Sequence, residues 1–198
     1  MTESVREEGP YGPLRRDVRL LGSLLGRVLV EQEGEGFLAE EEQIRASSRR
    51  SRDIGDPSVV RDAVRQLSPR GQARMLRAFA TYFQLANTAE QHHRIRRRRA
   101  YAEEVQTPRE SLVEAFELLA AVPADTVRRR LEQISIELVL TAHPTEATRR
   151  TMLRAHVRIA GLLTRNDDPD LTADERHELE DALAEEITIL WQTDEVRS

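Results

Sequence analysis

Hydrophobic side chains recur at helical spacing along most of the chain. Between residues 14 and 33, apolar positions three or four residues apart form one face of an amphipathic helix, namely Val18, Leu21, Leu25, Val28 and Leu29. Gly34 and Gly36 interrupt this pattern. Two further helices are predicted to begin at the Asp-Pro pair 56–57 and the Ser-Pro pair 68–69, because Asp or Ser caps a helix and proline fits its first turn.

The helix after Ser68 is predicted to run for several turns. Its apolar stripe reads Leu76, Phe79, Ala80, Phe83, Asn87 and Glu90. A capping box at Thr107-Pro108-Arg109-Glu110 predicts the next helix, which Pro123 ends. A shorter helix is expected at about residues 125–132.

One segment departs from helical spacing. Apolar and more polar residues alternate from Ile134 to Thr141, and this period of two predicts a short strand near residues 136–141 that Pro144 ends. Helical spacing then resumes in two stripes. The first is Met152, His156, Ile159 and Leu163; the second follows a capping box at Thr172 and Glu175 and reads Leu179, Leu183, Ile187 and Leu190.

A single strand cannot satisfy its own edges, so we expect it to belong to a larger sheet or barrel. The pattern therefore predicts a mostly helical piece of an α/β protein that is cut off after residue 198, preceded by a loose arm over residues 1–13. Aromatic residues make up only 4% of the chain, which also favours packing against something else.

Composition narrows the chemistry. All 30 basic residues are arginine, which excludes lysine-based covalent catalysis in this chain, and the absence of cysteine excludes disulfides and thiolate metal sites. No apolar run approaches the roughly 18 residues that span a membrane, and residues 1–10 do not resemble a secretory signal. We therefore expect a cytoplasmic protein that does not bind membranes.

Two charged clusters each have a functional and a plainer interpretation. The arginine-rich run 94–99 is either a nucleic-acid patch or a solvated basic segment; the net charge of −5 and the single nearby aromatic residue, Tyr101, favour the latter, so we expect no nucleic-acid partner. His92 and His93 point about 100° apart on a helix and are expected to bind no metal. His156 and His177 are assigned no role.

The strand leads directly into Thr141-Ala142-His143-Pro144-Thr145-Glu146. A histidine at the end of a strand, before a helix, lies where α/β enzymes place catalytic groups. The free N–H groups of the following helix and the side chains of Arg149 and Arg150 favour a bound phosphate or carboxylate. From these residues alone, His143 is either part of an anion-handling site or a hydrogen-bonded structural histidine.

The segment from Val139 to Arg150, VLTAHPTEATRR, resembles the N-terminal active-site signature of phosphoenolpyruvate carboxylase. Leu85–His93 (LANTAEQHH) and Leu190–Arg197 (LWQTDEVR) resemble two further stretches of that family, in the same order. The resemblance extends from about Leu14 to Arg197. It implies that residues 14–198 are the N-terminal part of a TIM-type α/β barrel enzyme with many extra helices, truncated after the first barrel strand and the helices that follow it.

The resemblance implies a lyase that carboxylates phosphoenolpyruvate with bicarbonate, giving oxaloacetate and phosphate, an anaplerotic carbon dioxide fixation. His143 would be the catalytic base, with Thr141, Pro144, Thr145, Arg149 and Arg150 near the active site. The family uses Mg²⁺ or Mn²⁺, whose ligands are expected downstream of this chain, and it forms homotetramers. The 198-residue chain alone is expected to be inactive. The roles of Asp194 and Glu195 stay open, whereas Trp191 is expected in the core.

Two other functions stay open. In the first, His143 is itself phosphorylated and acts as a phosphoryl carrier. In the second, the chain is a helical interaction fragment without catalytic activity.

Overall fold

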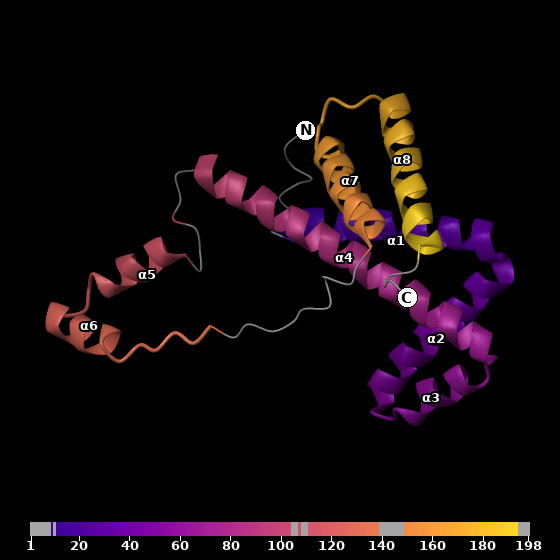
Figure 1. The fold of residues 1–198 in the computed structure, drawn as a ribbon, viewed down its shortest axis with the longest axis horizontal. Helices are drawn as coiled ribbons and strands as arrows, with labels where there is room; N and C mark the ends of the chain where they lie inside the picture. Colours follow the sequence, from indigo (N-terminus) through magenta and orange to yellow (C-terminus); the bar gives the residue numbers. More distant parts are fainter. Residues whose placement is uncertain (1–8, 10, 104–106, 108–110, 139–148, 194–198) are drawn as a thin grey trace. The chain divides into compact units, whose positions relative to one another are not determined.

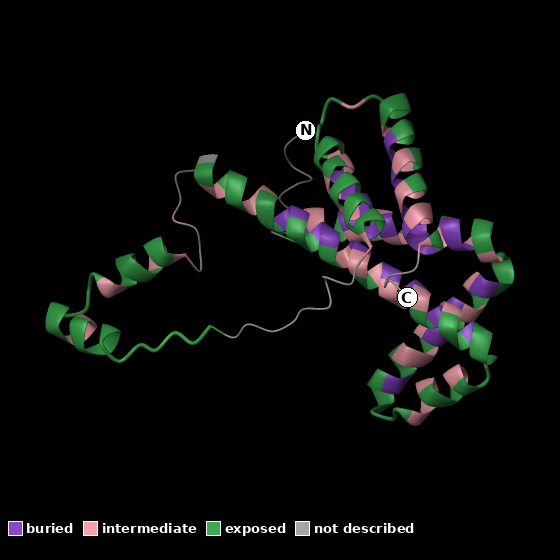
Figure 2. Cartoon of the chain, in the orientation of Figure 1, coloured by how far each residue is buried: buried purple, intermediate pink, exposed green. Residues whose placement is uncertain are grey.

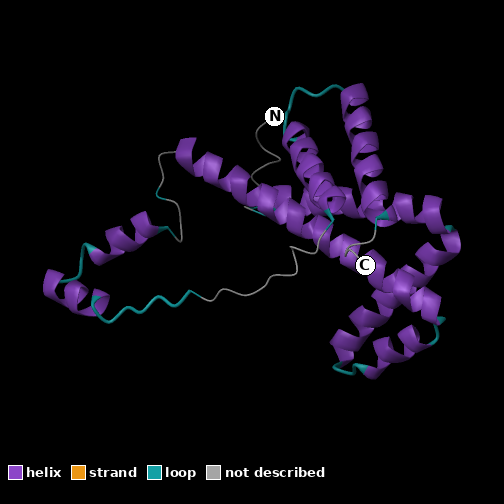
Figure 3. Cartoon of the chain, viewed as in Figure 1, coloured by secondary structure: helices purple, strands orange, loops and turns teal. Residues whose placement is uncertain are grey.

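The computed structural model describes residues 9, 11–103, 107, 111–138 and 149–193. Contacts divide the chain into two units, one formed by Met1–His92 with Ala147–Ser198 and the other by His93–Glu146. Figure 3 shows helices joined by loops throughout the described residues, so the prediction of a mostly helical chain is confirmed. None of these helices is long and apolar enough to cross a membrane.

The first unit contains α1 (Gly12–Glu33), α2 (Glu35–Ile54), α3 (Ser58–Arg65), the part of α4 (Pro69–Glu103) up to His92, α7 (Arg150–Asn166) and α8 (Ala173–Gln192). In Figure 1, α7 and α8 form a hairpin, and α8 also packs on α1. Figure 2 shows buried residues along α1, α4, α7 and α8. These helices therefore enclose one apolar core.

The stripes predicted for α1, α7 and α8 are the buried faces of those helices. Leu21, Val28 and Leu29 are almost fully buried on α1, as are Ile159 on α7 and Leu183 on α8. Local signals also set the start of α8, where the Thr172 hydroxyl accepts from the Glu175 N–H and the Glu175 carboxylate accepts from the Thr172 N–H. The hydroxyl and N–H of Thr172 lower the pKa of Glu175 by donating to its carboxylate.

The start signals of α3 and α4 are also confirmed. The Asp56 carboxylate accepts from the Ser58 N–H at 2.9 Å, which lowers the pKa of Asp56, and the Ser68 hydroxyl accepts from the Gly71 N–H at 3.1 Å. The sequence pattern gave no prediction for α2. It begins immediately after Gly34, whose φ of 88° and ψ of 164° give the chain a sharp reversal between α1 and α2.

The stripe predicted for α4 is largely wrong, although Phe79 does pack against the core. Leu76 and Phe83 are 73% and 61% exposed, whereas Met75, Leu85 and Ala89 are buried. The helix carries apolar residues on two sides, and periodicity alone does not tell which side meets the core. The face that packs is mixed: besides these apolar residues it buries Thr81, Thr88, His92 and His93.

The second unit contains the end of α4, α5 (Leu112–Leu119) and α6 (Ala124–Leu131). The cap of α5 is Ser111 and not Thr107, because the Ser111 hydroxyl accepts from the Glu114 N–H at 3.1 Å. Thr107 precedes Glu110 by three positions and Ser111 precedes Glu114 by three positions, so both pairs have the spacing of a capping box. The Thr107 hydroxyl instead donates to the Glu117 carboxylate at 2.8 Å. The helix predicted at about 125–132 is confirmed as α6.

The predicted strand is not observed in the described residues. Residues 134–138 form neither helix nor strand, and residues 139–141 lie outside the described part. An extended segment becomes a strand only when a neighbour completes its ladder of hydrogen bonds. Since the described segments provide no neighbouring strand, the barrel also stays a prediction of the family resemblance.

Gly34 and Gly26 give opposite predictions for replacement by alanine in this chain. Nothing lies within 4 Å of a Cβ added at either position, so the backbone conformation alone determines how the replacement changes the free energy of unfolding. Gly34→Ala is expected to lower the free energy of unfolding by about 1–3 kcal/mol, because the backbone of Gly34 is one that glycine alone adopts readily. Gly26→Ala, inside α1, is expected to raise it by up to about 1 kcal/mol.

Urea unfolding followed by circular dichroism measures both variants. Equal effects of the two replacements would contradict the assignment of Gly34 as the backbone hinge between α1 and α2.

Candidate active site

Four of the predicted site residues, Thr141, His143, Pro144 and Thr145, lie outside the described residues. The structure describes the two arginines that follow them. Arg149 has an extended backbone and precedes α7, and its carbonyl accepts from the Leu153 N–H at 3.2 Å. A helix therefore does resume directly after the predicted catalytic turn.

The two arginines differ in their surroundings. Arg150 is the first residue of α7 and is exposed, whereas Arg149 is half-buried. The Nε atom of Arg149 is shielded from solvent and has no hydrogen-bond partner among the described residues. A shielded donor without an acceptor is costly, and a carboxylate or phosphate oxygen would satisfy it. Arg149 is thus the described residue best suited to contact an anion beside the predicted turn.

Helix α7, which begins with Arg150 directly after Arg149, is linked to α4 by polar contacts. The hydroxyl of Thr88 on α4 lies 3.0 Å from Nδ1 of His156 on α7. Nε2 of His92 lies 2.9 Å from the carboxylate of Asp167, the residue that follows α7. Thr88 and His92 are 8% and 5% exposed, so both contacts are largely closed to water.

Sequence reasoning assigned no role to His92 and His156, because their partners are distant in sequence. The one signal that pointed to this region was the resemblance of Leu85–His93 to a family stretch. Among the described residues there is no group of three or more histidines and carboxylates that could hold an ion, so the pair of His92 and Asp167 is interpreted as a hydrogen bond.

The third family-like stretch begins at the end of α8. Trp191 is 5% exposed and its ring lies 6.2 Å from that of Phe37, with the guanidinium of Arg77 at 5.2 Å on the tryptophan ring. The prediction that Trp191 belongs to the core is confirmed. Asp194 and Glu195, whose roles the sequence left open, lie outside the described residues.

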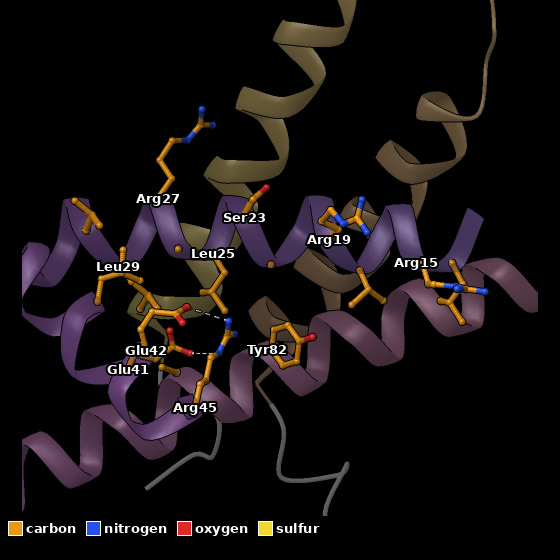
Figure 4. A pocket seen from close by; sticks show the side chains of 17 residues that line it. Arg15, Arg19, Ser23, Leu25, Arg27, Leu29, Glu41, Glu42, Arg45 and Tyr82 are labelled. Carbon is orange, nitrogen blue, oxygen red and sulfur yellow. Dashed lines mark hydrogen bonds and ion pairs between the residues drawn. The ribbon is translucent and has the colours of Figure 1, made fainter. Parts of the chain in front are cut away.

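A groove of about 900 Å³ lies between α1, α2 and α4, away from the predicted site (Figure 4). Its charges are largely satisfied within the protein. Arg45 pairs with Glu41 at 2.6 Å and Glu42 at 3.4 Å and stacks on Tyr82, and Arg27 pairs with Asp181 at 3.3 Å. None of the predicted site residues lines it. The groove is therefore not the candidate active site.

Glu41, at the edge of this groove, has a raised pKa. Burial is the largest cause, and the nearby Arg45 opposes it. A carboxyl whose pKa is raised in the folded state stabilises the fold fully below its ordinary pKa of 4.5, and that stability is lost as the pH rises through the folded-state pKa.

Glu41→Gln is expected to remove this pH dependence. The variant and the unchanged protein should have similar melting temperatures at pH 4, and the variant should melt at the higher temperature at pH 7. Differential scanning calorimetry at both pH values measures the difference. Glu42→Gln is the matched control, because Glu42 pairs with the same arginine but is exposed. A variant that melts below the unchanged protein at pH 7 would contradict the raised pKa.

Comparison with known proteins gives a consistent match. The family model described as phosphoenolpyruvate carboxylase matches residues 14–198. Proteins of that name from Alcanivorax borkumensis and Pseudomonas fluorescens Pf-5 are each 41% identical to the chain, over 192 and 189 residues, and one from Actinobacillus pleuropneumoniae is 36% identical over 194 residues. These alignments cover 93–96% of this chain but only 21–22% of the relatives. The chain thus spans about a fifth of the length of the curated relatives it matches.

Proposed function

The chain belongs to the phosphoenolpyruvate carboxylase family, and from this premise we propose that a full-length protein containing it carboxylates phosphoenolpyruvate with bicarbonate, giving oxaloacetate and phosphate. The observation that carries the proposal is the family match over residues 14–198, which includes the segment around His143. In this proposal residues 14–198 are the N-terminal part of the enzyme.

The proposed reaction begins with transfer of the phosphoryl group of phosphoenolpyruvate to an oxygen of bicarbonate. This transfer gives carboxyphosphate and the enolate of pyruvate. The imidazole of His143 then takes the proton of carboxyphosphate, whose C–O bond to phosphate breaks and releases CO₂ and phosphate. The enolate carbon attacks CO₂ and forms the new C–C bond of oxaloacetate.

A histidine suits the proton transfer because the ordinary pKa of imidazole lies near neutral pH. Exclusion of water also matters, since water would protonate the enolate and give pyruvate. The half-buried guanidinium of Arg149 supports this proposal, because its shielded Nε offers a hydrogen bond to a phosphate or carboxylate oxygen just after the turn that holds His143. Thr141, Pro144, Thr145 and Arg150 are proposed to shape the same turn.

The family resemblance also implies Mg²⁺ or Mn²⁺. Within the described residues no cluster of histidines and carboxylates fits such an ion, so we propose that its ligands come from elsewhere in the full-length protein and derive no step through it. A homotetramer and a cytoplasmic location are likewise proposals based on the family.

His143→Asn in a full-length enzyme is expected to lower the rate of oxaloacetate formation by about 10²–10⁴-fold, because the general base is lost. The KM for phosphoenolpyruvate should change little. Release of phosphate with formation of pyruvate should persist, since phosphoryl transfer comes before the step that uses His143. Assays coupled to malate dehydrogenase and lactate dehydrogenase measure the two products.

His177→Asn is the matched control, because the side chain of His177 is 72% exposed on α8. Unchanged carboxylation by His143→Asn would remove His143 from the mechanism. Acid-labile phosphate on His143 after mixing with phosphoenolpyruvate would favour a phosphohistidine carrier instead.

The purified 198-residue chain is expected to show no carboxylation. The metal would lack its ligands, and electrostatic stabilisation of the reacting groups is usually the largest contribution to catalysis. Exposed apolar side chains such as Leu112, Phe116 and Leu118 of α5 should also favour self-association. The malate dehydrogenase assay with phosphoenolpyruvate, bicarbonate and Mg²⁺ tests activity, and light scattering tests association. Turnover above background would show that this chain holds a complete site.

A further inference from the structure

We propose that Thr88 and His92 of α4 are positioning residues, which hold α7 so that Arg149 and Arg150 at its start lie where the reaction needs them. This inference rests on the proposed function. It starts from the two polar contacts between α4 and the α7 segment, Thr88 with His156 and His92 with Asp167.

The Thr88 hydroxyl contacts two groups, the Gln84 carbonyl and the His156 ring. The Thr88 hydroxyl donates to the carbonyl of Gln84, at 3.0 Å, within α4. A hydroxyl has one proton, so with that proton committed to Gln84 it accepts from His156, 3.0 Å away. In this arrangement Nδ1 of His156 is the donor. This contact is therefore directional at both ends and is specific to a hydroxyl at position 88.

The second contact, between His92 and Asp167, holds the C-terminal end of α7. Nε2–H of His92 donates to the Asp167 carboxylate at 2.9 Å, and Asp167 is the C-terminal cap residue of α7. His156 and Asp167 lie 6 and 17 residues after Arg150, which correspond to about 9 and 26 Å along the helix axis. Two anchors at different heights fix both the axial position and the rotation of α7.

Apolar packing alone would not fix that position. Ala89 on α4, and Ala155 and Ile159 on α7, are completely buried in the same core. Burial of apolar surface is non-directional, so it specifies the rotation and axial position of a helix less sharply than hydrogen bonds do. Hydrogen bonds weaken steeply when their geometry changes, and the two anchors therefore select one placement of α7.

The start of α7 is the point where this placement affects chemistry. Arg149 and Arg150 directly follow the predicted catalytic turn and belong to the end of the helix that the anchors orient. A displacement of about 1 Å at an active site costs up to about a hundredfold in rate. A weakened anchor is thus expected to act on kcat, although neither Thr88 nor His92 touches substrate in this proposal.

The test replaces Thr88 in a full-length family enzyme that contains this chain. Thr88→Val keeps the shape and removes the hydroxyl, and it is expected to lower kcat by about ten- to a hundredfold with little change in the KM for phosphoenolpyruvate. Thr88→Ser retains the hydroxyl and should restore kcat to near the original value. Thr81→Val is the matched control, because Thr81 is 4% exposed on the same helix, about two turns earlier.

A second variant reaches the other anchor without opening the core. Asp167→Ala removes the acceptor of His92, and the Asp167 side chain is 38% exposed. It should lower kcat as well, whereas Glu178→Ala, which removes an exposed carboxylate on α8, should not. Hydrogen exchange of the α7 amides gives a readout that does not depend on activity, and it should rise in Thr88→Val and Asp167→Ala but not in the two controls.

Three results would overturn the inference: kcat unchanged in both Thr88→Val and Asp167→Ala, an equal loss in Thr81→Val, or a loss of kcat without faster exchange in α7. Absence of carboxylation in the unchanged full-length protein would instead overturn the proposed function, and with it the role of the anchors in the reaction. The exchange data would still decide whether Thr88 and Asp167 hold α7.

Discussion

Burial of the apolar face of α8 is the constraint on which the first unit depends. Leu179, Leu183, Ile187 and Leu190 follow one another at helical spacing and are at most 2% exposed. Helices α1 and α7 both pack against α8, so residues at the two ends of the chain share one core. The same core positions α7, which begins at Arg150.

Sequence patterns predicted this core well where the signals are local and each helix has a single apolar face. The stripe of α8 and its box at Thr172 and Glu175 needed no knowledge of partners. On α4 the pattern failed because Leu76 and Phe83 form a second apolar face, which the described residues leave exposed. The choice between two faces is made by the neighbouring helices, and a single sequence does not specify those neighbours.

The candidate site was predictable in a different way. His143 was found through the resemblance of a twelve-residue segment, and its turn lies outside the described residues. The contact between Thr88 and His156 joins residues 68 positions apart, and neither residue has a spacing that predicts the other. The strand predicted before His143 meets the same difficulty, since a strand exists only with a partner to complete its hydrogen bonds.

The buried polar residues of α4 connect the apolar core with the candidate active site. Polar groups inside a core cost free energy unless they are hydrogen-bonded, and apolar residues of similar size often pack with equal or greater stability. A buried threonine and a buried histidine therefore contribute more to selecting one arrangement of the helices than to the stability of the fold. The segment around Thr88 and His92 also resembles a family stretch, although it contributes no group to the proposed chemistry. A requirement for one placement of α7, and through it of Arg149, gives a physical reason for polar residues where an apolar core would suffice.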